Sequence, residues 1–292
     1  MNRVYIPILL IVGLVVTEVH GQSTISNSPL EISTGQGLWG AFLPAYELGV
    51  DSNGSPAIRD DMDVVGYHGD LRAVRRFLGT RTSLESRVFY GAAESTTNSG
   101  VGNFYVPRPI DGSLVGLVGR TRGLRSEVEN YGFDLSLRDT WITRFGGLSA
   151  GCGLSYIAFD QSFDSTAGPD DLLREELDSD FRGGKAIVGW DGSFCGRPTN
   201  IDLLIGFYDM NADYSSQAGS LGPSVSEELS KSVTTIETNF TTRRDFRNIQ
   251  VGTTVGVMYF SDMPTINHTL GEAVSLGTND AVTLKFLFEI LL

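Results

Sequence analysis

Basic residues, cysteines and histidines are scarce in this sequence. Its 292 residues include 22 Lys and Arg against 35 Asp and Glu, which gives a formal net charge of −13. A chain this acidic is repelled by phosphate backbones, so nucleic-acid binding is not expected. Two cysteines are too few for a disulfide scaffold, and three histidines are too few for a convincing metal site. We therefore expect neither a metal nor another cofactor.

Long apolar runs are missing after the N-terminus. Residues 4–16 are almost wholly apolar and follow the basic start Met1-Asn2-Arg3, but no later stretch approaches the roughly 18 apolar residues of a transmembrane helix. Val19 and Gly21 are residues of the kind that signal peptidase accepts before its cleavage site. Residues 1–21 are thus predicted to be a signal peptide that directs export through the general secretory pathway. An uncleaved anchor is the alternative.

Alternation of polarity with period two is the main positive signal. In the closing segment, apolar residues fill every second position from Val282 to Leu292, opposite Thr283, Lys285 and Glu289. This pattern indicates a β-strand with one polar and one apolar face. Similar or weaker patterns bring the total to ten predicted strands. They cover 37–48, 64–77, 82–93, 128–141, 148–163, 185–194, 201–210, 233–242, 249–260 and 282–292.

The connections between these strands are alternately short and long. Four short polar links are predicted to be hairpin turns, at 79–81, 144–147, 196–200 and 243–245. Long segments rich in Ser, Gly, Asn and Asp are predicted to be loops, at 49–63, 94–127, 164–184, 211–232 and 261–280. Structureless loops this long are unusual in a compact soluble domain. Short turns on one side and long loops on the other are typical of transmembrane β-barrels.

The sequence therefore predicts an all-β fold, an antiparallel up-and-down transmembrane β-barrel of about ten strands, with eight or twelve as alternatives. A short N-terminal segment, 22–36, would precede a barrel domain over 37–292. The apolar faces would point to lipid. In a soluble exported β-barrel or sandwich, the other possibility, they would point inward. Four aromatic residues near strand ends fit interfacial girdles: Tyr131, Trp141, Trp190 and Tyr259.

Two stretches resemble known outer-membrane proteins. Phe133-Asp134-Leu135-Ser136-Leu137-Arg138, a glycine turn, Gly153-Leu154-Ser155-Tyr156 and then Phe159 to Phe163 resemble the central hairpin of exported outer-membrane β-barrel proteins common in planctomycete bacteria. They are more distantly similar to the major outer-membrane protein family of Legionella. The closing segment, 284–292, resembles the C-terminal signal read by the barrel-assembly machinery, although it ends in Leu292 instead of an aromatic residue. The resemblance implies a surface-exposed barrel in outer-membrane lipid and brings no catalytic residues.

Two patterns are compatible with catalysis, and neither is expected to carry it. Gly147-Leu148-Ser149-Ala150-Gly151 matches the nucleophile elbow of hydrolases, but an elbow needs a following helix, whereas β-alternation here continues to Tyr156. Asp60, Asp61 and Asp63 would meet His268 at the outer rim if the first strand pairs with the last. A rim-active hydrolase is therefore kept as an alternative to a non-enzymatic barrel with a hydrated, acidic rim.

Charged residues gather in two places. The loop predicted at 164–184 is acidic, and 169–177 has the length for one or two helical turns; this loop would either capture divalent cations or simply stay hydrated. Its acidic residues are Asp164, Asp170, Asp171, Glu175, Glu176, Asp178 and Asp180. The presumed lumen face carries Asp70, Arg72, Glu85, Arg87, Asp134 and Arg138. Paired charges of this kind fill the interior of narrow barrels or line a narrow polar passage.

The predicted function is that of a mostly closed outer-membrane barrel with a structural or surface-interaction role. Slow permeation of small solutes is a subsidiary role, and a general diffusion porin is the alternative. Cys152 and Cys195 are predicted on opposite strand faces, which disfavours a disulfide. No catalytic, cofactor-binding or metal-ligating residue is assigned.

Overall fold

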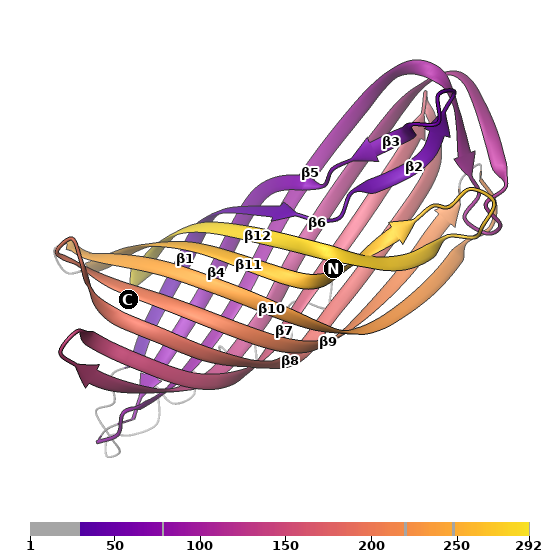
Figure 1. Cartoon of the computed structure of the whole chain (residues 1–292). Coiled ribbons are helices and arrows are strands. Elements are labelled where there is room, and N and C mark those ends of the chain that lie inside the picture. The colour runs from indigo at the N-terminus through magenta and orange to yellow at the C-terminus, as the bar shows by residue number, and fades with distance from the viewer. Residues whose placement is uncertain (1–29, 78, 219–220, 247–248, 292) are drawn as a thin grey trace, which may run out of the picture.

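A computed structural model describes residues 30–77, 79–218, 221–246 and 249–291 (Figure 1). Extended strands and their connections make up this part of the chain, and no helix in it is long and apolar enough to cross a membrane. The predicted signal peptide and the start of the segment 22–36 lie outside the described residues. The first strand begins at Leu30, seven residues before the predicted start of the barrel domain.

All strands belong to one antiparallel sheet (Figure 1). They are β1 (Leu30–Phe42), β2 (Tyr46–Asp51), β3 (Pro56–Asp60), β4 (Asp63–Arg76), β5 (Thr82–Pro107), β6 (Leu114–Thr143), β7 (Gly146–Ala167), β8 (Asp170–Phe194), β9 (Arg197–Ala218), β10 (Val225–Phe246), β11 (Ile249–Asn267) and β12 (Ser275–Leu291).

The sheet closes into a barrel. β1 pairs with β12 on one side and with β4 on the other, and from β4 onward each strand pairs with the next. Within the described residues the ring thus holds ten strands, and the β2–β3 hairpin is attached to upper β5 through Val50 and Asp51. Closure leaves the ring without a free edge along its lower part. The predicted all-β, antiparallel, up-and-down barrel is confirmed.

The segments predicted as long loops are mostly strand, and that expectation was wrong. β5 and β6 are 26 and 30 residues long, and their pairing continues from the predicted strands up to Pro107 and Leu114. The helical turns expected over 169–177 are also absent, since β8 begins at Asp170. The barrel therefore has two distinct ends. The turn end holds the short links, and the tall end is the part that extends beyond the predicted strands. The tall end consists of 43–63, 94–129, 160–182, 209–231 and 262–280.

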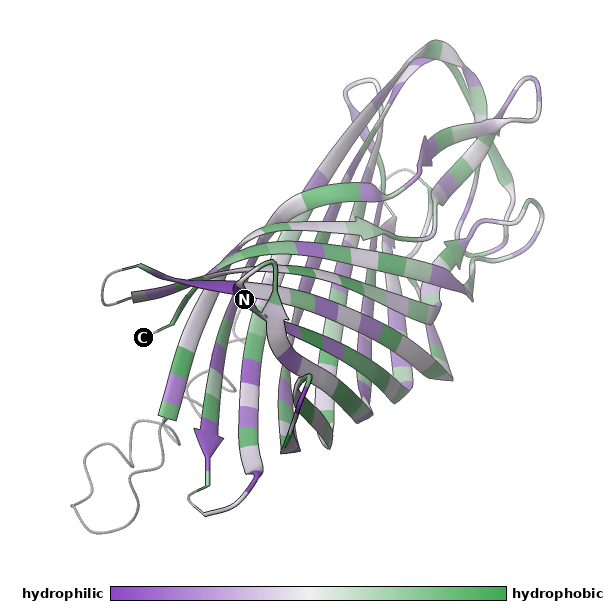
Figure 2. Cartoon of the chain, turned by 60° about the vertical axis from the view of Figure 1, so that its left-hand side comes forward, coloured by the Kyte–Doolittle hydropathy of each residue, from purple (hydrophilic) through white to green (hydrophobic). Residues whose placement is uncertain are grey.

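The face of the sheet that carries the apolar residues changes from outward to inward partway along the strands. In β8, Phe181 and Lys185 both point inward, whereas Asp178 and Val188 both point outward. Outward residues are thus apolar near the turn end and charged in the tall end, and inward residues show the reverse. Figure 2 shows hydrophobic (green) and hydrophilic (purple) residues alternating along the strands. These extensions are not predicted from the sequence because their alternation has the opposite phase to that of the lower strands.

An apolar belt surrounds the lower half of the barrel. Leu135 is 42% exposed and Val255 is 45% exposed, whereas Arg138 is 8% exposed. The apolar faces of the predicted strands therefore point outward, and the inward orientation expected of a soluble barrel is excluded there. Among the most exposed belt residues are Leu38, Val65, Leu154, Val188, Phe207 and Phe288.

Aromatic residues lie at both margins of this belt. On β6, Tyr131 lies at the upper margin of the belt. The next outward residue toward the tall end is the charged Glu129. Near the turn end, Trp141 is 40% exposed, and the indole N–H of Trp190 donates to the carbonyl oxygen of Phe145 at 3.0 Å. This arrangement matches two interfacial girdles.

Candidate functional site: the blocked lumen

Charged side chains from seven strands meet inside the barrel at the level of the apolar belt. We call this group the ionic layer. It consists of Asp70, Arg72, Glu85, Arg87, Asp134, Arg138, Lys185, Asp202, Glu237 and Lys285. All of these residues belong to the inward-facing set of their strands, which includes the six lumen residues predicted from the sequence.

The half of the ionic layer nearer the turn end is built on Arg138. Its Nη1 donates to Oδ1 of Asp202 at 2.7 Å, and its Nε lies 3.3 Å from Oε2 of Glu85. Glu85 also accepts a hydrogen bond from Nη2 of Arg72 at 2.9 Å. Two guanidinium groups thus share one buried carboxylate and join β4, β5, β6 and β9 across the lumen.

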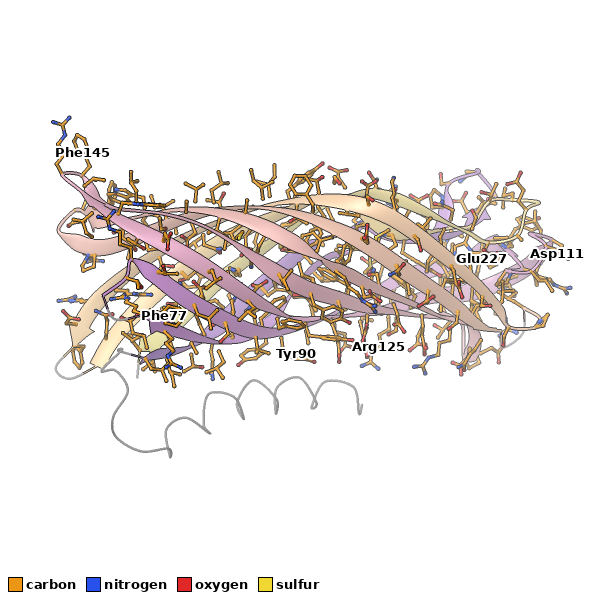
Figure 3. All side chains as sticks on the ribbon, turned by 90° about the horizontal axis from the view of Figure 1, so that it is seen from below. Phe77, Tyr90, Asp111, Arg125, Phe145 and Glu227 are labelled. Atoms are coloured by element: carbon orange, nitrogen blue, oxygen red, sulfur yellow. The ribbon has the colours of Figure 1, made fainter. Side chains whose placement is uncertain are left out.

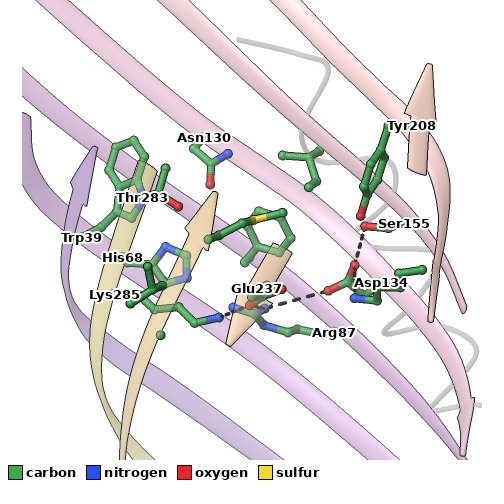
Figure 4. A pocket seen from close by; sticks show the side chains of 16 residues that line it. Trp39, His68, Arg87, Asn130, Asp134, Ser155, Tyr208, Glu237, Thr283 and Lys285 are labelled. Atoms are coloured by element: carbon green, nitrogen blue, oxygen red, sulfur yellow. Dashed lines mark hydrogen bonds and ion pairs between the residues drawn. The ribbon is translucent and has the colours of Figure 1, made fainter. Parts of the chain in front are cut away.

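The other half is built on Lys185, Lys285 and Arg87, and Figure 4 shows Arg87 and Lys285 close to Glu237. Nζ of Lys185 lies 2.7 Å from Oδ1 of Asp134, and Nζ of Lys285 lies 2.7 Å from Oε1 of Glu237. Nε of Arg87 lies 3.1 Å from Oδ2 of Asp70. Because the carboxylates are paired with cations and almost fully buried, the layer is a set of cross-links between strands of the barrel wall, not a row of sites free to bind a solute.

Two small cavities, of about 40 and 50 Å³, remain within the ionic layer. His68 lines the first cavity together with Trp39 and Tyr208, and its ring lies against Phe89 at a centroid distance of 6.1 Å. His68 is 3% exposed, and neither of its ring nitrogens has a protein hydrogen-bond partner. Each cavity has room for only a few water molecules.

An apolar layer closes the lumen above the ionic layer. The rings of Phe159, Phe181 and Phe260 are each at most 1% exposed, and their centroids lie 5.5 to 6.1 Å apart. They come from β7, β8 and β11, and Trp39 of β1 lies 6.5 Å from Phe159. A tightly packed aromatic cluster excludes water, so it forms a second barrier.

The β2–β3 hairpin fills the lumen higher in the tall end. Nη1 of Arg122 on β6 donates to the carbonyl oxygen of Ala57 at 2.9 Å, and the hydroxyl of Ser126 donates to Asp60 at 2.9 Å. Both β6 residues face inward, so the hairpin packs against the inner wall. Leu48 is fully buried and Ile58 nearly so.

A buried carboxylate anchors this hairpin. The hydroxyl of Tyr46 donates to Oε2 of Glu175 at 2.5 Å, the hydroxyl of Tyr214 donates to Oε1, and Nε2 of His268 lies 3.2 Å from Oε2. Tyr46 also stacks on Phe163 at 4.4 Å. Burial by itself would raise the pKa of Glu175, but His268 and the two tyrosine hydroxyls outweigh it and hold this pKa below its usual value.

The tip of the β5–β6 hairpin arches across the tall end to the β11–β12 loop (Figure 1). The backbone N–H of Val274 donates to the carbonyl oxygen of Pro109 at 2.9 Å, and that of Gly271 donates to Gly112 at 3.1 Å. Gly112 has φ +65°, and a Cβ there would lie 2.2 Å from the backbone of Glu272. Only glycine fits this contact, which completes the cover over the lumen.

The rim residues considered for catalysis do not meet. His268 contacts Glu175, and Asp60 is bonded to Ser126 and to the N–H of Met62. Asp61 pairs with Arg59 at 2.8 Å on the surface, and Asp63 begins β4. The sequence predicts Glu175 in an acidic loop, whereas it lies on the inward face of β8. The signal for its burial is its position midway between Leu173 and Leu177, which share that face.

The remaining predicted features fall on regular strands or turns. β7 runs straight through Ser149, as the alternation predicted. In the acidic segment, Nε of Arg174 lies 3.6 Å from Asp164 and 3.4 Å from Glu176. No cluster of three metal-ligating side chains occurs in the part of the chain that the structure describes. Cys152 and Cys195 are both exposed and free; Cys195 lies in the β8–β9 turn, not on a strand face.

Comparisons with known proteins add little. No family model and no curated protein matches this chain. Among solved structures it is similar to the outer membrane protease OmpT from Escherichia coli, with 11% identity over 93% of this chain and 98% of that chain and a TM-score of 0.43. It is also similar to the P. putida toluene transporter TodX (10% identity, 91% and 90% covered, TM-score 0.27) and to a Pseudomonas aeruginosa FadL homologue (7%, 91% and 90%, 0.26).

Proposed function

We propose that this chain is an outer-membrane β-barrel protein with a closed lumen and a structural or surface-interaction role. The observation that carries the proposal is the change of polarity along the long strands, such as β8 and β9. Outward residues such as Leu203 and Phe207 on β9 are apolar and exposed, whereas Asp213 on the same face of that strand is charged. Lipid next to the lower half and water next to the upper half account for both.

Orientation follows from the lengths of the two ends. In such barrels the short turns face the periplasm and the long connections face outward. The tall end, with its acidic outer surface, would therefore stand above the outer leaflet and meet surface partners. Export through the general secretory pathway and assembly through the C-terminal strand β12 are part of the proposal. On β12, the outward belt residues Phe286, Phe288 and Ile290 are 40% to 59% exposed.

A closed barrel is favoured over a diffusion porin because three obstacles lie in series. The ionic layer, the aromatic cluster around Phe181 and the β2–β3 hairpin each fill the lumen. The two cavities of the ionic layer, about 40 and 50 Å³, have room for only a few water molecules. A hydrolase has no support in the geometry, since the side chains of Glu175 and His268 are buried. No catalytic role is proposed.

Two measurements test the proposal. A folded membrane barrel changes its mobility on a gel when it is boiled, and it fractionates with outer membranes. Identical mobility before and after boiling, with recovery in the soluble periplasm, would overturn the membrane assignment. Planar bilayers containing the folded protein should show no stepwise currents. Regular conductance steps would favour the porin.

A further inference from the structure

Every short turn at the turn end combines a phenylalanine with an arginine at most three residues away. The four pairs are Arg76 with Phe77, Arg144 with Phe145, Arg197 with Phe194, and Arg244 with Phe246. The four phenylalanines are 38%, 70%, 61% and 63% exposed. Figure 3 shows Phe77 and Phe145 at the same end of the barrel, opposite Asp111 and Glu227. We call these eight residues the collar.

The two ends of the barrel differ in charge. The turn end holds seven arginines against four carboxylates. These counts cover the described parts of 30–31, 75–82, 139–147, 190–200 and 243–250. The tall end holds eight basic residues against 24 carboxylates. The chain is strongly acidic as a whole, so a local excess of arginine at one end is a departure from its composition. It makes the turn end attractive to anions.

The geometry of the collar suits an interface between lipid and water. Its turns directly follow the lower margin of the apolar belt, where Trp141 and Trp190 lie. The guanidinium carbon of Arg144 lies 4.5 Å from the centre of the Phe145 ring. Arg76 is 59% exposed although its Nη2 lies 3.1 Å from Glu31. Exposed phenylalanine enters the boundary of the acyl chains, and arginine binds phosphate oxygens through a planar, bidentate group.

We propose that the collar binds the phosphate headgroups of anionic lipids in the leaflet next to the turn end. The inference rests on the proposed membrane location and adds a lipid partner to it. The repeat of one arginine and one exposed phenylalanine at all four turns favours a lipid surface over a carboxylate-bearing cell-wall polymer, because such a polymer offers no acyl region for the phenylalanines. Arginines near an anionic lipid surface strengthen its binding through electrostatic attraction.

The test compares two variants with the same change of net charge. In the collar variant, Arg76, Arg144, Arg197 and Arg244 are changed to Gln. In the control, the tall-end residues Arg59, Arg125, Arg174 and Arg182 are changed to Gln; they are 52% to 67% exposed. Each full-length protein is inserted into vesicles of phosphatidylcholine with spin-labelled phosphatidylglycerol or spin-labelled phosphatidylcholine. The immobilised fraction of each label gives the lipid selectivity.

Wild type and control should select phosphatidylglycerol several-fold over phosphatidylcholine, and the collar variant should show a ratio near one. Sodium chloride at high concentration should reduce the selectivity, since it is electrostatic. Equal selectivity in all three proteins, or an equal loss in the control, would overturn the inference. Complete loss of the phosphatidylglycerol selectivity in millimolar inorganic phosphate would also overturn it, because it would indicate a site for free anions. The same holds if wild type and control co-sediment with purified cell-wall sacculi and the collar variant does not. Heat-modifiable insertion into phosphatidylcholine alone tests the membrane location separately.

Discussion

Nζ of Lys185 on β8 lies 2.7 Å from Oδ1 of Asp134 on β6, although β7 separates the two strands in the sheet. Asp134 also accepts a hydrogen bond from the hydroxyl of Ser155 on β7 at 2.6 Å. One buried carboxylate thus ties three neighbouring strands together inside the lumen. The ionic layer holds the wall in shape as well as blocking the passage.

Loss of one partner from this pair should be costly. Lys185→Met leaves the Asp134 carboxylate without its closest cation, and we expect the free energy of unfolding to fall by about 3 kcal/mol. The double change Asp134→Leu with Lys185→Met should lie within about 1 kcal/mol of wild type, since no unpaired charge is left. Urea unfolding in lipid vesicles measures both. A single variant as stable as the double would contradict the assignment.

The matched control is an ion pair on the outer surface. Arg125 lies 2.7 Å from Glu94, and both side chains are 52% exposed. Arg125→Met should lower the free energy of unfolding by less than about 1 kcal/mol, because solvent screens exposed pairs.

The anchor of the β2–β3 hairpin should make stability depend on pH. The folded pKa of Glu175 lies below its unfolded value of about 4.5. Its contribution is therefore fully present above pH 4.5 and is lost as the pH falls through the folded pKa. Glu175→Gln removes this contribution, so the loss of stability below pH 4.5 should be steeper in wild type than in the variant. Parallel pH profiles would contradict the role of Glu175.

The position of the belt can be tested on one face of one strand. Leu203 and Asp213 both point outward on β9, ten residues apart. Leu203→Arg places a charge in lipid and should cost about 2–4 kcal/mol, whereas Asp213→Arg should change stability by less than about 0.5 kcal/mol. Equal effects at the two positions would mean that both face the same solvent.

Gly112 should be essential to the contact that closes the tall end. Gly112→Ala brings a Cβ against the backbone of Glu272, so the tip of the β5–β6 hairpin should detach and its amides should exchange faster with solvent. Gly54→Ala is the control, because Gly54 has a similar φ of +80° with open space around it. Conductance should stay absent in both, since the ionic and aromatic layers remain.

The sequence predicted the lower half of the barrel well, and it missed the upper half for a physical reason. Alternation in the closing segment and around Leu135 revealed strands whose apolar faces point outward, and Arg138 was correctly placed in the lumen. Above the belt the solvent changes from lipid to water, and the alternation reverses. Glu175 and His268 lie far apart in the chain, and no local pattern pairs them. Their contact depends on closure of the whole sheet.

The most direct test of the account uses Cys152, which is exposed on the outer face of β7 within the belt. A fluorophore on Cys152, in a Cys195→Ser background, should be quenched by brominated lipids and protected from aqueous iodide. The same fluorophore at Asp213→Cys, with both native cysteines replaced by Ser, should show the opposite pattern. Quenching of the Cys152 probe by iodide, with no effect of brominated lipid, would contradict the claim that this face of the barrel lies in a membrane.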